Sequence, residues 1–86
     1  MEKGFMKRVV LNPKVMVGKP VIKGTRITVE SIVHRVAQGM TFDEIIEDYP
    51  YITKDDIKSA LLYANSLVAG EDIFPAIVND KNAVSH

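Results

Sequence analysis

The residues best suited to catalysis in this 86-residue chain are its carboxylates and two histidines, because it has no cysteine. Four carboxylates lie close together: Asp43, Glu44, Glu47 and Asp48. Residues four apart share a helix face, so these side chains form two pairs opposite the apolar residues and face water. His34 and His86 have neither metal-ligand nor catalytic-triad spacing. We therefore expect no enzyme, catalytic residue, metal or cofactor; the alternative is a hydrolase that uses the four carboxylates with a divalent metal.

Positive charges instead indicate anion binding. Four cations lie within thirteen residues of the N-terminal half: Lys14, Lys19, Lys23 and Arg26. They lie in a predicted β element with exposed turns, which could contact DNA phosphates or enter a groove. Lys19, Lys23 and Arg26 are our candidate DNA-binding residues here. The alternative is an ordinary lysine-bearing loop whose charges prevent strand-to-strand aggregation.

The formal net charge of zero conceals two unlike halves. Residues 1–40 carry eight Lys and Arg against two Asp and Glu, a net +6, whereas residues 41–86 carry three against nine, a net −6. Such segregation predicts two binding surfaces of opposite sign, or simply two solvated faces. If the fold brings Lys23 and Arg26 against Asp55 and Asp56, the basic footprint cancels.

The C-terminal tail, residues 70–86, contains an apolar run that needs a partner surface. Two acidic residues precede the run at 73–78, and an acidic flank favours a basic target. The candidate partner-binding residues are Glu71, Asp72, Ile73, Phe74, Ile77 and Val78. The alternative is that the run folds back on its own core. We assign residues 1–69 to one domain and 70–86 to the tail.

Residues 8–29 predict short strands separated by turns, because β-branched residues alternate there with turn-formers. The turns are expected at Asn12-Pro13, Gly18 and Gly24. From residue 29 the apolar spacing changes to that of a helix, predicted over 29–38 and ended by Gly39. The fold class is therefore mainly α, with a short N-terminal β element before a three-helix domain.

Two further helices begin at capping boxes. Thr41 and Glu44 start a helix that Pro50 ends, and Thr53 with Asp56 starts the longest helix, over 54–69. These two helices and their short turn have the helix-turn-helix arrangement.

In this arrangement Thr53, Lys54 and Lys58 are the candidate DNA-binding residues of the last helix. Asp55 and Asp56 repel phosphate, so the alternative is a capped helix start facing solvent.

No apolar stretch approaches a signal peptide or the ~20 residues of a membrane span, so we expect a cytoplasmic protein without membrane contact. Its small size and the paired half-sites that many DNA-binding proteins read favour a homodimer.

Residues 18–27, GKPVIKGTRI, carry a specific motif that resembles the domain-of-unknown-function family 433. The similarity covers roughly residues 8–68 and includes Gly39-Met40-Thr41, Glu44-Ile45, Asp48-Tyr49-Pro50, Thr53, Asp56-Ile57, Ala60-Leu61 and Tyr63-Ala64. That family is similar to homeodomain-like and winged helix-turn-helix domains and resembles VapB-type antitoxins. The resemblance implies a PIN-like ribonuclease toxin as partner, promoter binding by the N-terminal domain and a C-terminal segment that plugs the toxin.

We therefore expect the antitoxin of a prokaryotic toxin–antitoxin pair, which binds double-stranded DNA to regulate its own transcription and neutralises a ribonuclease. The alternative is a protein-interaction module that never touches DNA.

Overall fold

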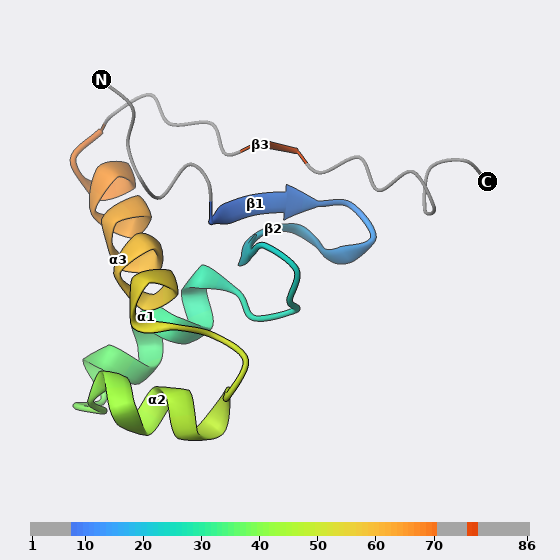
Figure 1. The fold of residues 1–86 in the computed structure, drawn as a ribbon. Helices are drawn as coiled ribbons and strands as arrows, with labels where there is room; N and C mark the ends of the chain where they lie inside the picture. The colour runs from blue at the N-terminus through green and yellow to red at the C-terminus, as the bar shows by residue number, and fades with distance from the viewer. Residues whose placement is uncertain (1–7, 71–75, 78–86) are drawn as a thin grey trace.

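In the part of the chain that the structure describes, three helices pack together beside a small β-sheet (Figure 1). The computed structural model describes residues 8–70 and 76–77. Its elements are β1 (Val9–Asn12), β2 (Val15–Ile22), α1 (Val29–Ala37), α2 (Phe42–Asp48), α3 (Lys54–Val68) and β3 (Ala76–Ile77). The three predicted helices behind a β element are confirmed. The fold class is nevertheless mixed α/β rather than mainly α, because the β element forms a sheet of three strands.

The sheet has the order β2-β1-β3, with β1 and β2 antiparallel and β3 parallel to β1. The predicted turn at Asn12-Pro13 is confirmed, and the Asn12 side chain accepts a hydrogen bond from the Lys14 N–H at 2.9 Å. The predicted break at Gly18 is wrong, because β2 runs through it to Ile22. Gly18 takes φ +79° inside the strand, and Pro20 is tolerated because β2 is an edge strand.

The helix starts follow from their caps. Thr41 and Glu44 form one capping box, with hydrogen bonds of 2.8 and 3.1 Å, and Thr53 and Asp56 form the other, at 2.9 and 3.1 Å. Both boxes were predicted, and both are confirmed. They satisfy backbone N–H groups that have no partner inside the helix.

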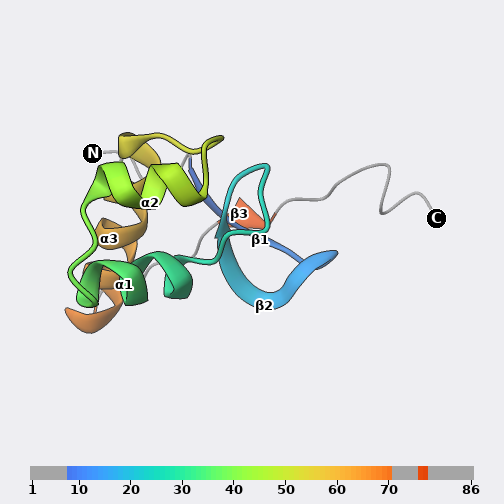
Figure 2. The same ribbon diagram turned by 90° about the horizontal axis from the view of Figure 1, so that it is seen from below.

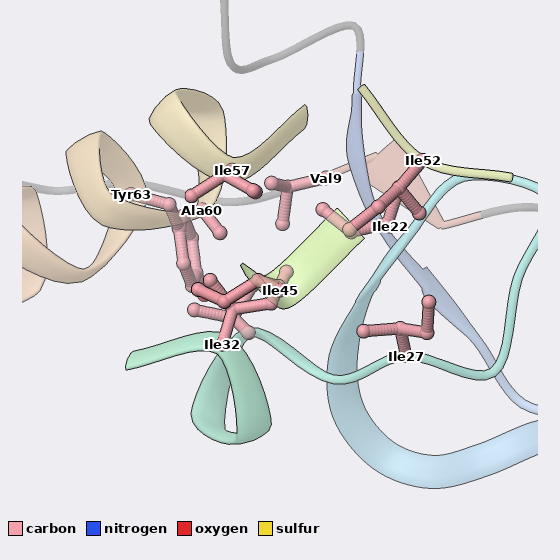
Figure 3. Packing of buried hydrophobic residues seen from close by; sticks show 10 residues of the cluster. Val9, Ile22, Ile27, Ile32, Ile45, Ile52, Ile57, Ala60 and Tyr63 are labelled. Atoms are coloured by element: carbon pink, nitrogen blue, oxygen red, sulfur yellow. The ribbon is translucent and has the colours of Figure 1, made fainter. Parts of the chain in front are cut away.

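The core lies where the helices meet one face of the β1–β2 hairpin (Figures 2 and 3). The hairpin contributes Val9 and Ile22, and one isoleucine of each helix is fully buried: Ile32, Ile45 and Ile57. Burial raises the pKa of Tyr63, which lies on α3 in the same cluster. Because Val9 and Ile22 of the hairpin are buried in the same cluster as residues of α1, α2 and α3, apolar burial holds the hairpin against the helices.

Part of the predicted tail joins the sheet of its own chain. Ala76 pairs with Val10 and Ile77 with Leu11, so these two residues fold back, although Ile77 stays 62% exposed. Glu71, Asp72, Ile73, Phe74 and Val78 lie outside the described residues. No helix among the described residues is long and apolar enough to span a membrane.

Candidate nucleic-acid interface

A short turn, residues 22–27, forms the centre of the candidate site. Gly24 adopts φ +80°, a backbone conformation that glycine reaches without a steric penalty. The Thr25 N–H donates to the Ile22 carbonyl at 3.0 Å, and the Thr25 hydroxyl donates to the same carbonyl at 2.8 Å. That hydroxyl also accepts from the Ile27 N–H at 2.9 Å, while the Ile22 N–H donates to the Ile27 carbonyl at 2.9 Å. The turn is therefore closed by four hydrogen bonds.

This turn holds two exposed cations on a buried base. Ile22 and Ile27 are buried in the core, whereas Lys23 and Arg26 are exposed between them. Among the described residues, neither cation has an ion-pair partner. In particular, they do not pair with Asp55 and Asp56. Two uncompensated positive charges on a rigid turn form a surface for an anion.

A groove of about 630 Å³ runs beside the turn. Lys23 and Arg26 line it, and Val10, Val15 and Val21 of the hairpin form its apolar part. Tyr51, from the connection between α2 and α3, lines it as well and is 67% exposed. Tyr51 is not among the site residues predicted from the sequence, and the signal that could have identified it is an aromatic side chain directly after Pro50 in the turn between the last two helices.

The other predicted DNA-binding residues are placed differently. Lys19 donates to Glu30 at 2.9 Å, and Lys54 lies 3.4 Å from Asp43. The hydrogen bond from Lys19, and then its charge, lower the pKa of the Glu30 carboxyl.

Thr53 uses its hydroxyl to cap α3, and Lys58 is exposed on α3 without an ion-pair partner among the described residues. The turn and groove bring together Lys23 and Arg26, but the structure does not place the other candidates at this groove.

The basic and acidic halves partly neutralise each other through other residues. Arg8 lies 3.0 Å from Asp56 and 3.8 Å from Asp55, which ties the start of β1 to the start of α3. Arg35 of α1 forms an ion pair with Asp48 and lies over the Tyr49 ring, 4.7 Å from its centre. These ion pairs reduce the net positive charge of residues 1–40, whereas none of the ion pairs between described residues involves Lys23 or Arg26.

Asp56 should contribute more to stability than its neighbour Asp55. The Asp56 carboxylate is 14% exposed and accepts from both Arg8 and the Thr53 N–H, whereas Asp55 is 68% exposed and meets Arg8 only at 3.8 Å. We expect Asp56→Ala to lower the free energy of unfolding by about 2 kcal/mol and Asp55→Ala by less than about 1 kcal/mol. Urea denaturation followed by circular dichroism measures both; equal losses would contradict this assignment.

The four carboxylates of α2 are exposed, as predicted. Asp43 meets Lys54, Glu44 completes the capping box and Asp48 pairs with Arg35. In the part of the chain that the structure describes, no group of three or more His, Cys, Asp or Glu residues is placed to hold a metal ion. The described contacts of these carboxylates are therefore structural.

Fold and site together define a small α/β domain of three helices and a hairpin, with a cationic turn at its surface. The chain belongs to the family described as protein of unknown function DUF433, whose model matches residues 9–64. This finding bears out the family resemblance.

Two relatives carry no assigned function. The uncharacterized protein y4eO of Sinorhizobium fredii is 31% identical over 55 residues, which are 64% of this chain and 25% of that protein. An uncharacterized protein of Archaeoglobus fulgidus is 69% identical over 26 residues, 30% of this chain and 72% of that protein. The chain thus spans about a quarter of the length of the first relative. No solved structure matches the chain significantly.

Proposed function

We propose that this protein is the DNA-binding antitoxin of a prokaryotic toxin–antitoxin pair, which regulates its own transcription and neutralises a PIN-like ribonuclease in the cytoplasm. The observation that carries the DNA-binding part is a pair of exposed cations, Lys23 and Arg26, which form no ion pair with any described residue and lie on a turn fixed by hydrogen bonds. A rigid cationic turn loses little conformational entropy when it meets phosphate, which favours binding. The antitoxin part rests on the family resemblance and on the composition of the C-terminal segment.

A homeodomain-like or winged helix-turn-helix domain is part of this proposal. In it, α2 and α3 form the helix pair and the β1–β2 hairpin supports the cationic turn. The start of α3 is occupied by Asp55 and Asp56, which repel phosphate. We therefore assign the main phosphate contacts to Lys23 and Arg26 and a secondary contact to Lys58.

The toxin contact is assigned to the C-terminal segment. Ala76 and Ile77 pair with the edge of β1, so this segment starts from a fixed position on the domain. The acidic and apolar residues around it, at 71–74 and 78, would then meet a basic, apolar surface of the toxin. In this proposal a homodimer presents two cationic turns to one duplex.

The salt dependence of DNA binding tests the proposal. A fluorescent duplex from the region upstream of the gene is titrated with the full chain at several salt concentrations. Lys23 and Arg26 of both subunits in a dimer predict a slope of log affinity against log salt of about −3.6, because each neutralised phosphate contributes about −0.9, and the secondary contact of Lys58 would make the slope steeper. Absence of binding, or affinity that does not change with salt, would exclude this DNA contact.

A protein-interaction module without DNA binding is the second candidate. It is favoured by large apolar side chains that α3 exposes: Leu62 is 54% and Val68 is 88% exposed. This function predicts a stable complex with the product of the neighbouring gene and no shift of DNA in a gel. Deletion of residues 71–86 would abolish the complex if the tail carries the contact.

A further inference from the structure

The groove beside the cationic turn offers more than phosphate contacts. A turn that meets only a duplex backbone needs cations, and the apolar part of the groove adds nothing to that contact. Yet Tyr51, which is 67% exposed, and the partly exposed Val15 also line the groove. These groups fit a planar apolar surface, and the adjacent cations fit a negative charge attached to it.

We propose that this groove binds an unpaired nucleotide of a single-stranded nucleic acid. The base stacks against Tyr51, and the phosphates on either side of it meet Lys23 and Arg26. Single-strand-binding proteins combine the same two components, aromatic platforms for the bases and a positively charged groove for the backbone. A volume of about 630 Å³ is within the range of small-ligand sites.

Charge complementarity selects this occupant. Lys23 and Arg26 have no carboxylate partner among the described residues, so the ligand supplies the negative charge. An apolar peptide would leave both cations without partners, and a purely inorganic anion would leave the exposed Tyr51 ring in water. Only a ligand that joins a flat ring to an anion satisfies both parts of the groove.

One polar group in the groove can face the base. Asn12 lines the groove and accepts the Lys14 N–H through its side-chain oxygen, so its amide NH₂ is the group left to donate. A pyrimidine carbonyl, as in thymine or uracil, accepts such a hydrogen bond. Oligothymidylate and oligouridylate are therefore the probes of choice.

This inference shares Lys23 and Arg26 with the proposed duplex contact, but it adds Tyr51, which that contact does not use. The two can be separated by experiment. If a Tyr51 variant loses affinity for single strands but keeps its affinity for the duplex, the two ligands use different contacts. If the full chain binds single strands but no duplex, the proposed operator contact fails and the groove assignment stands.

The chain contains no tryptophan, so Tyr51→Trp introduces a single fluorescent reporter at the groove. We expect 12-nucleotide oligothymidylate or oligouridylate to quench the fluorescence of this tryptophan. Stronger quenching by oligothymidylate would identify single-stranded DNA as the ligand, and stronger quenching by oligouridylate would identify RNA. Leu62→Trp is the matched control, because Leu62 is 54% exposed on α3 and does not line the groove. No quenching in either arm, or equal quenching of the control, would overturn the proposal.

Affinity measured by fluorescence anisotropy gives an independent readout. Tyr51→Ala should weaken single-strand binding about tenfold or more, because removing an aromatic platform loses base stacking. Tyr51→Phe keeps the ring and should bind like the original chain, with circular dichroism confirming that each variant is folded. Unchanged single-strand affinity in Tyr51→Ala, or the same loss for the duplex of equal sequence, would overturn the assignment of Tyr51.

Discussion

Replacing Ile57 by alanine is expected to lower the free energy of unfolding by about 2–5 kcal/mol, the range for removing a large aliphatic side chain from a packed core. Ile57 is fully buried on α3, in the cluster that also holds Val9 of β1 and Ile45 of α2. Alanine there leaves a cavity that a core shared by sheet and helices cannot easily close. Because small domains are stable by about 5–15 kcal/mol, the variant should be partly unfolded at physiological temperature.

Two companion variants show whether the loss comes from the cavity. Ile57→Val removes one methyl group at the same place and should cost only about 0.5–1.5 kcal/mol. Leu62→Ala removes the same number of carbon atoms as Ile57→Ala, but from a side chain that is 54% exposed, and should therefore cost less. Chemical denaturation followed by circular dichroism measures all three. An Ile57→Ala chain as stable as Leu62→Ala would show that the helices do not pack on the hairpin through Ile57.

The helices were predictable because their starts depend on local chemistry. A threonine followed three residues later by a carboxylate specifies its own hydrogen bonds at Thr41 and Thr53, whatever the rest of the chain does. The helical spacing of apolar residues then indicates the buried face of each helix, which includes the buried Ile32, Ile45 and Ile57. The turn at Gly24 was predictable for a similar local reason.

The strand β2 was harder to predict, because Gly18 and Pro20 are usual turn residues. Their tolerance depends on a non-local fact, namely that β2 lies at the edge of the sheet and pairs with β1 on one side. The mixed α/β class depends on a second non-local fact, the pairing of β3 with β1 that completes a sheet of three strands among the described residues. Sequence periodicity does not show which strand is an edge.

The site was only half predictable. Lys23 and Arg26 could be selected from their charge, but Tyr51 lies 25 residues beyond Arg26 and reaches the groove only through the packing of α2 and α3. The partners of the ion pairs could not be predicted from the sequence either. Asp56 could be expected to cap α3, yet its pairing with Arg8, 48 residues away, requires the fold. Among the described residues, Asp56 therefore pairs with Arg8 and not with Lys23 or Arg26.

The double substitution Lys23→Ala/Arg26→Ala should remove most of the proposed duplex binding. Each lost phosphate contact should reduce the salt slope by about 0.9, or about 1.8 per subunit. Affinity should fall by about tenfold or more per contact, because hydrogen bonds to charged groups contribute about 1.5–3 kcal/mol. Fluorescence anisotropy with the upstream duplex at two salt concentrations measures both quantities.

The matched control is Lys19→Ala/Lys54→Ala, which removes the same number of positive charges. Lys19 already meets Glu30, and Lys54 already meets Asp43, so each of these lysines would have to leave a carboxylate before it could bind phosphate. The control should therefore lose much less affinity and keep most of its salt slope. If both double variants lose affinity equally, the duplex responds to total charge alone. The proposal of a specific contact at the turn between Ile22 and Ile27 would then be wrong, because a specific contact depends on the positions of the two cations and not only on their charge.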